Sequence, residues 1–331
     1  MCVHYESEVF HKRDFTDPAE RIARLLEIWS ARIATAFREA IESIKTELDL
    51  RELEVLIARG ELNRVESRIT AAATRVASVS GEAFVASARD TSRLLSQALT
   101  TTISFDLSNE RAISLVRRNR LNLIAEFTQE QREVVRASVI NSLQTGQGPR
   151  RQAQVVRDAI GLTASQNRAV DNYRALLEAG SRQALSRDLR DRRFDSTIRN
   201  ARRRPLTPEQ IERQVQRYRE RFLAFRALNI GRFQAGVALN QARHESYRQA
   251  IESGRLDESQ IQRSWNTNID SRERLSHNIL NGATVRGLSE RYVTITGARL
   301  LHPIDPLGPA DEVFNCRCTE SFTITGAPNR T

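Results

Sequence analysis

Long apolar runs, cysteines and secretory signals are all missing or scarce in this 331-residue chain. No segment approaches the ~20 consecutive apolar residues that span a bilayer, so no membrane-spanning helix is expected. Residues 1–15 carry charges and histidines where a signal peptide needs an apolar stretch. Three cysteines are too few for a disulfide framework. We therefore expect a soluble protein that is made in the cytosol.

Glycine and proline are also sparse. The chain has 14 glycines and 8 prolines, which favours long helices over many turns. Aromatic residues make up only 6%, but hydrophobic residues reach 40%, enough for a buried core. The length predicts about two domains, since domains average roughly 150 residues.

Acidic residues are outnumbered by basic ones, 41 against 51, which gives a net charge of +10. This balance indicates an acidic partner such as nucleic acid. Only two of the basic residues are lysines, Lys12 and Lys45. A GC-rich genome explains the excess of arginine over lysine as well as a function does, so the ratio is not a sign of function.

The first hundred residues have the apolar spacing of helices. Asp17 and Pro18 form an N-terminal cap, and the helix that follows is predicted to continue to Gly60. A second helix is predicted over 61–101, then an extended segment over 100–106. The apolar stripe of the first helix fits burial within a bundle better than docking on a partner helix. Its residues are Ile22, Leu25, Trp29, Ile33, Phe37, Ile41 and Ile44.

Three further helix starts are predicted where a threonine precedes a glutamine by three residues. Between them, residues 146–149 read Gly-Gln-Gly-Pro, which predicts a break. The threonine and glutamine pairs are Thr128 with Gln131, Thr163 with Gln166, and Thr207 with Gln210.

The helix predicted over 209–253 is the longest. It carries a short heptad run beside a stripe of small residues that would let another helix approach closely. Packing within a helical bundle is the favoured interpretation over an exposed coiled coil. The heptad positions are Ile211, Val215, Tyr218, Phe222 and Phe225, and the small residues are Gly231, Ala235, Ala238 and Ala242.

Past Gly254, proline and glycine become dense and two β-prone pieces appear, 292–295 and 322–325. The predicted fold is mainly α: an elongated multi-helix body with a long central helix and a small α+β C-terminal domain. The predicted domains are an N-terminal helical arm (1–104), a helical body (105–254) and the α+β domain (255–331).

Residues 182–226 hold most of the excess positive charge, with fourteen arginines against six acidic residues. One interpretation is a surface that contacts nucleic acid phosphates without reading sequence. A solvated helix face laced with Arg–Asp pairs is the simpler alternative, and an acidic protein partner is a third. The candidate contacts are Arg192, Arg193, Arg199, Arg202, Arg203 and Arg204.

Three reactive side chains near the C-terminus, His277, Cys316 and Cys318, form a candidate zinc site. Against it, Cys-x-Cys is a tighter spacing than usual and there is no second cysteine pair. The alternatives are a structural knot, with Asp270 or Asp305 paired to arginine and the cysteines buried, or a Cys–His nucleophile pair. The other histidines, His4, His11 and His244, are predicted to lie on the surface or on a helix face.

Four short motifs follow one another in this region. They are Trp265 to His277 with Asp-x-Arg-x-Arg inside, Leu280-Asn-Gly282, Leu300 to Asp305, and the closing Asn-Cys-Arg-Cys. This ordered set resembles the phage Mu F-like minor head protein family, over roughly residues 105–325. One departure is Gln234, where related sequences often carry glutamate. The motif residues expected to be structural are Trp265, Asp270, Arg272, Arg274, Asn315 and Arg317.

The resemblance implies a minor capsid or head morphogenesis protein of a tailed bacteriophage or prophage, not an enzyme. Such a protein sits inside the head near the portal and assists procapsid assembly and DNA packaging or delivery. The implied partners are the portal protein, the major capsid or scaffolding protein and double-stranded phage DNA, with no membrane and no cofactor beyond the candidate zinc. It would be found in the host cytoplasm during assembly and then in the virion. The alternative is a phage-delivered, toxin-like enzyme using the Arg/His/Cys cluster.

Overall fold

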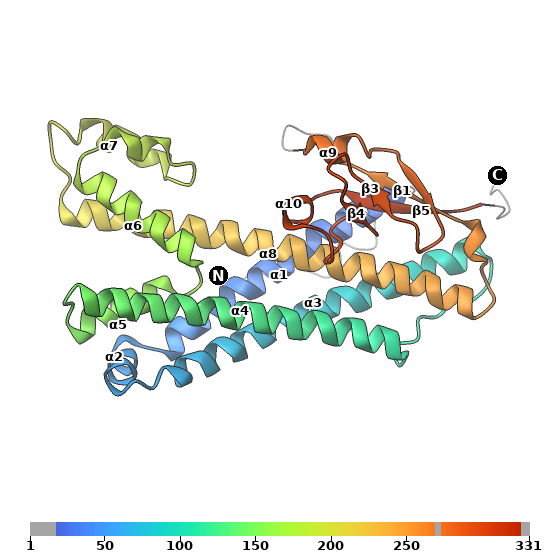
Figure 1. Ribbon diagram of the computed structural model, residues 1–331, viewed down its shortest axis with the longest axis horizontal. Helices are drawn as coiled ribbons and strands as arrows, with labels where there is room; N and C mark the ends of the chain where they lie inside the picture. The colour runs from blue at the N-terminus through green and yellow to red at the C-terminus, as the bar shows by residue number, and fades with distance from the viewer. Residues whose placement is uncertain (1–17, 269–272, 326–331) are drawn as a thin grey trace, which may run out of the picture. The chain divides into compact units, whose positions relative to one another are not determined.

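A computed structural model describes residues 18–268 and 273–325 (Figure 1). The chain is mainly α-helical with a few short antiparallel strands near its C-terminus, which confirms the predicted fold class. Among the helices in these ranges, none combines the length and hydropathy needed to cross a bilayer. The helices are α1 (Pro18–Glu47), α2 (Leu50–Arg59), α3 (Leu62–Ala98), α4 (Glu110–Gln144), α5 (Pro149–Ala159), α6 (Ala164–Glu178), α7 (Asp195–Asn200), α8 (Pro208–Glu252), α9 (Leu275–Asn278) and α10 (Ala310–Val313).

The chain folds into two compact units that each combine distant segments. Among the described residues, unit 1 contains 18–30, 82–115, 232–268 and 273–325, and unit 2 contains 31–81 and 116–231. Helices α1, α3, α4 and α8 contribute residues to both units. The three consecutive domain ranges expected from the sequence stay a prediction, and the description below follows the two units.

The predicted helix up to Gly60 is two helices. The chain leaves the helical path at Leu48 and Asp49, and the Asp49 carboxylate accepts a hydrogen bond of 2.7 Å from the backbone N–H of Glu52. An aspartate that caps a following helix competes with continuation of the preceding one. Gly60 does end α2, with a φ of 68°.

Two of the three predicted helix starts are confirmed. Thr163 and Gln166 form a reciprocal capping box at α6, and Thr207 and Gln210 make the same pair of bonds at α8. The predicted break at 146–149 separates α4 from α5. The Thr128 cap is wrong because Thr128 lies inside α4, where its hydroxyl is 3.3 Å from that of Thr70 on α3.

Gln131, which the sequence placed in that cap, instead holds the turn after α5. Its side chain is fully buried and accepts from the N–H of Gly161 at 2.7 Å while donating to the carbonyl of Leu162 at 3.1 Å. Gly161 has a φ of 97°, a backbone conformation that glycine alone adopts easily. A Cβ there would lie 2.9 Å from a methyl group of Ile41 and 3.0 Å from one of Leu223.

Gly161→Ala is therefore expected to lower the free energy of unfolding by about 2 kcal/mol, from backbone strain and overpacking together. Urea denaturation followed by circular dichroism measures this. Gly146→Ala is the matched control, since Gly146 has a φ of 65° but nothing within 4 Å of its would-be Cβ. The control should lose only the ~1 kcal/mol of backbone strain, and equal losses would remove the packing part of the explanation.

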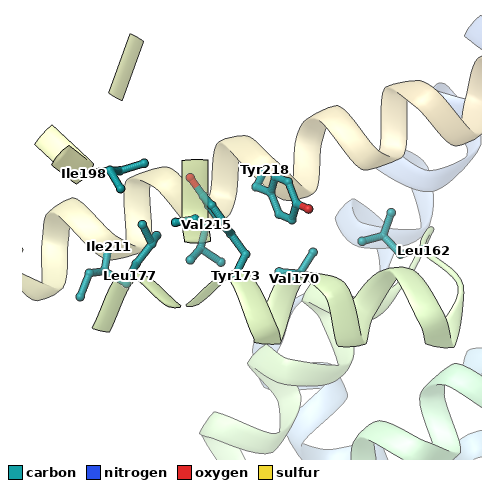
Figure 2. Close-up of a cluster of buried hydrophobic side chains, with 9 residues drawn as sticks. Leu162, Val170, Tyr173, Leu177, Ile198, Ile211, Val215 and Tyr218 are labelled. Atoms are coloured by element: carbon teal, nitrogen blue, oxygen red, sulfur yellow. The ribbon is translucent and has the colours of Figure 1, made fainter. Parts of the chain in front are cut away.

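The heptad face of α8 packs inside unit 2, as the bundle interpretation predicted. Figure 2 shows the Tyr173 ring of α6 beside Tyr218 of α8, with the ring centroids 4.3 Å apart. Ile211 and Val215 are buried in the same cluster, and Phe222 packs against it. Phe225 differs, since 45% of its surface is exposed. The heptad run is thus an intramolecular core that ends before Phe225.

The apolar stripe of α1 is also buried within the chain. All seven of its predicted residues, from Ile22 to Ile44, are buried. Self-burial was the favoured interpretation, and this burial leaves no exposed stripe on α1 for a partner helix.

Unit 1 contains the small α+β region. A three-stranded antiparallel sheet has the order β2-β1-β5, and β3 pairs with β4. The Phe322 ring of β5 stacks on Tyr247 of α8, 4.2 Å between centroids, so the sheet lies beside the C-terminal part of α8 (orange and red in Figure 1). The strands are β1 (Ile261–Asn266), β2 (Thr284–Arg286), β3 (Tyr292–Val293), β4 (Arg299–Leu300) and β5 (Thr319–Ile324).

The small-residue stripe of α8 is buried, while the close approach of another helix that the sequence predicted stays a prediction. Gly231, Ala235, Ala238 and Ala242 are all buried. Next to them, Gly236 faces Ile304 so closely that a Cβ at residue 236 would collide with the isoleucine side chain. The loop before α10 is thereby held against α8.

Candidate functional site

The His277 imidazole and the thiols of Cys316 and Cys318 meet in the C-terminal region of unit 1. His277 Nδ1 lies 3.5 Å from Cys316 Sγ and 3.4 Å from Cys318 Sγ. All three residues are buried, and their donor atoms lie within 4.8 Å of one another. The structure thus brings together the three residues that the sequence singled out as candidate metal ligands.

Local backbone geometry places these side chains. His277 sits on the single turn of α9, and the Arg274 guanidinium just before that turn donates to the carbonyl of Phe314. Asn315 then has a φ of 59°, a left-handed conformation that asparagine tolerates better than most residues. Residues 316–318 have no regular secondary structure, and the sulfurs of Cys316 and Cys318 both lie beside the His277 ring.

The pKa values of the two thiols are shifted in opposite directions. The Cys318 thiol, the backbone N–H groups of Cys318 and Ile304 and the charge of Arg274 lower the pKa of Cys316 against the opposing effect of burial. Hydrogen bonding to Cys316 and burial raise the pKa of Cys318.

Glu312 is a fourth member of the cluster, which the sequence gave no reason to select. Its Oε2 lies 3.0 Å from His277 Nε2, within ion-pair distance but without hydrogen-bond alignment. Ser276 Oγ donates to the same carboxylate at 2.9 Å, and Thr296 donates to its other oxygen. Burial raises the pKa of Glu312, but the hydrogen bonds from Thr296 and Ser276 and the electrostatic interaction with His277 together lower it.

The other motif residues differ in their burial and contacts. Trp265 is fully buried and meets the His277 ring edge to face, 5.2 Å between centroids. Arg274 and Asn315 hold the Asn-Cys-Arg-Cys segment as described above, and Arg317 between the two cysteines is half-buried. Asp270 and Arg272 lie outside the described residues. Asp305 pairs with Arg291 at 3.2 Å, as the structural-knot alternative expected.

A second buried polar cluster is centred on Glu320 of β5. Its carboxylate accepts hydrogen bonds from Arg263 Nη1 at 2.9 Å, His244 Nε2 at 2.8 Å and the Tyr292 hydroxyl at 3.1 Å. Arg243 donates to the Glu320 backbone carbonyl at 2.6 Å. Glu320 and Arg263 are both completely buried. Local sequence contains no signal for this cluster, because its members come from α8, β1, β3 and β5.

His244 lies on a face of α8, one of the two positions that the sequence predicted, but it is buried there and not on the surface. Burial lowers the pKa of His244 to about 4, although Glu320 opposes the change. Its Nδ1 has no hydrogen-bond partner among the described residues. A proton added there would be buried and unpaired, which explains why the neutral form is favoured.

Stability is therefore expected to depend on pH through His244. The unfolded chain binds this proton below about pH 6.5, but the folded protein binds it only below about 4. Above about pH 6.5 His244 should not lower the free energy of unfolding. As the pH falls from there toward 4, the free energy of unfolding should decrease by at most ~1.4 kcal/mol per pH unit. Comparing wild type with His244→Gln by urea denaturation across this window isolates the histidine. The fall should be shallower in the variant, and identical profiles would contradict the assignment.

The basic segment 182–226 separates into structural and exposed arginines. Arg226 is buried, donates to the Gly161 carbonyl at 3.0 Å and pairs with Glu130. Arg190 makes two hydrogen bonds to Asp195, at 2.9 and 3.0 Å. These arginines stabilise unit 2, so part of the local charge belongs to the Arg–Asp alternative.

All six arginines predicted to contact phosphates are exposed. Arg193 pairs with Asp191 at 2.6 Å, and Arg199 lies 3.9 Å from Asp195. The remaining four make no ion pair with any residue in the described ranges. These four are Arg192, Arg202, Arg203 and Arg204. The last three are consecutive and lie in the turn after α7, as the sequence predicted.

Comparison of the chain with protein-family models, with curated proteins and with solved structures finds no match. The resemblance to the Mu F-like family stays a prediction that depends on the ordered C-terminal motifs.

Proposed function

We propose that this chain is a minor head protein of a tailed bacteriophage or prophage. In this role it acts inside the head near the portal and assists procapsid assembly and the packaging or delivery of DNA. The observation that carries the proposal is that the motifs which resemble the Mu F-like family lie together in the fold. The motifs are separate in sequence, but their residues Trp265, His277, Cys316 and Cys318 form one buried cluster.

The charge distribution supports contact with DNA. The chain carries a net charge of +10, and four of the six candidate arginines make no ion pair in the described part of the chain. Each arginine that neutralises a phosphate releases condensed counterions, which favours binding without sequence preference. Packaged double-stranded DNA offers many such phosphates.

Burial of the cysteines favours a structural role over the enzyme alternative. A nucleophile must be reached by its substrate. Cys316 is 2% exposed, Cys318 5% and His277 1%. Side chains with so little exposed surface are poorly placed to meet a substrate, which supports a structural role.

Co-expression with the portal protein of the phage or prophage that encodes this chain tests the proposal. The two proteins are sedimented together and separately, at low and high salt, with and without nuclease. We expect co-migration with the portal that survives nuclease. Co-migration lost on nuclease or salt would leave DNA as the ligand without a portal contact, and separate sedimentation in every condition would overturn the portal assignment.

A further inference from the structure

We propose that His277, Cys316 and Cys318 bind one Zn²⁺ ion, which fastens α9 to the Asn-Cys-Arg-Cys segment. The inference does not depend on the proposed function. It starts from three buried donor atoms that lie within 4.8 Å of one another.

The distances between donors fit a tetrahedral zinc ion. With Zn–S near ~2.3 Å and Zn–N near ~2.05 Å, a tetrahedral angle separates sulfur from nitrogen by about 3.6 Å. The structure has 3.5 Å and 3.4 Å between His277 Nδ1 and the two sulfurs. Binding would thus require little change in the distance from His277 Nδ1 to either sulfur.

The identity of the donors selects the class of metal. Two thiolates and one imidazole are soft and borderline ligands, which favour zinc over magnesium or calcium. Three protein donors leave the fourth tetrahedral position for a water molecule. A disulfide between Cys316 and Cys318 is a poor alternative, because two cysteines separated by one residue strain the bond, and both thiols are free.

Glu312 supplies the outer support that metal-binding histidines usually have. A ligating imidazole typically directs its other ring nitrogen at a carboxylate, which sets its tautomer and orientation. His277 Nδ1 faces the sulfurs, while Nε2 lies 3.0 Å from Glu312 Oε2. Ser276 in turn holds that carboxylate oxygen at 2.9 Å. A proton on Nε2 leaves the Nδ1 lone pair directed at the metal position.

Two backbone N–H groups lie beside the Cys316 sulfur. The N–H groups of Cys318 and Ile304 both approach the Cys316 sulfur. Ile304 does so from a φ of 60°, an uncommon conformation for a β-branched residue. Such strain persists only where the surroundings impose it and is typical of ligand sites. Close packing of Ile304 against Gly236 supplies that constraint.

Zinc content measured by mass spectrometry on the reduced, full-length protein tests the inference. The protein is purified without metal-affinity resin, dialysed and compared with the variants Cys316→Ser and His277→Gln. We expect about one zinc per chain in the wild type and at least a tenfold loss in each variant, since both remove a ligand. Cys2→Ser is the matched control, the same substitution at the third cysteine of the sequence, and should keep its zinc.

Cobalt substitution keeps the inference testable if the variants fail to fold. Wild-type protein loaded with Co²⁺ should show thiolate-to-cobalt charge-transfer absorption together with the visible bands of a tetrahedral ion. A strong chelator should lower its thermal midpoint, because metal binding contributes folding free energy. The inference would be overturned if the wild-type protein contained no zinc and showed no cobalt bands. It would also be overturned if Cys316→Ser kept its zinc and Cys2→Ser lost it.

Discussion

Glu320→Gln is expected to lower the free energy of unfolding by about 3–5 kcal/mol, the usual cost of removing one partner from a buried ion pair. The substitution keeps the size and shape of the side chain but removes its charge. The Arg263 guanidinium, which is completely buried, then loses the only carboxylate with which it is paired in the described residues.

The other contacts of Arg263 do not compensate for that charge. Its Nε donates to the Gly287 carbonyl at 2.6 Å and its Nη1 to the Leu301 carbonyl at 2.6 Å. These carbonyls satisfy N–H groups but carry no net charge, so the cation remains uncompensated in a low-dielectric interior. His244 and Tyr292 also lose a charged acceptor.

Urea denaturation followed by tryptophan fluorescence measures the effect, because Trp265 lies in the same region, 5.1 Å from Tyr292 between ring centroids. Glu27→Gln is the control, since Glu27 makes only an exposed ion pair with Arg24 in the same unit. It should change stability by less than ~1 kcal/mol. A Glu320→Gln protein as stable as the control would show that the cluster does not stabilise the fold.

Replacing Arg202, Arg203 and Arg204 together with glutamine is expected to weaken binding to double-stranded DNA about 100-fold at ~0.1 M salt. All three side chains are exposed and make no ion pair in the described ranges, so they are available for phosphates. The plot of log affinity against log salt should become shallower by about 2–3 units, because each phosphate contact contributes ~0.9. Fluorescence anisotropy with a short duplex of arbitrary sequence measures both quantities.

The matched control removes the same charge from another surface of unit 2. Arg117, Arg118 and Arg120 of α4 are exposed and also lack ion pairs in the part of the chain that the structure describes. Their triple glutamine variant should bind DNA nearly as well as the wild type. Equal losses in the two triple variants would mean that net charge, and not the turn after α7, determines binding.

Local chemistry explains which parts of the fold could be predicted. A cap such as Thr163 with Gln166 is satisfied by atoms within three residues, so the sequence pattern was enough to identify it. Thr128 and Gln131 have the same pattern but failed, because their side chains bond Thr70 and the turn at Gly161 instead. A pattern cannot tell whether its polar groups have a better partner elsewhere.

The candidate site shows the same limit. His277, Cys316 and Cys318 were selected because of their residue types, and the structure brings them together. Glu312 and Glu320 were missed because a single glutamate carries no pattern. The burial of His244 was missed because its helix face is buried by β5, a strand 76 residues further along the chain.

The sequence by itself determined the mainly α fold, the long helix α8, the breaks beside Gly60 and Pro149, and the identity of the metal-ligand candidates. These features depend on spacing and on interactions within a few residues. Only the tertiary structure decided which arginines of the basic segment are exposed, which carboxylates are buried and which partners they have. Those outcomes depend on burial and on charges contributed by distant segments, because a charged group leaves water only where the folded chain supplies a partner.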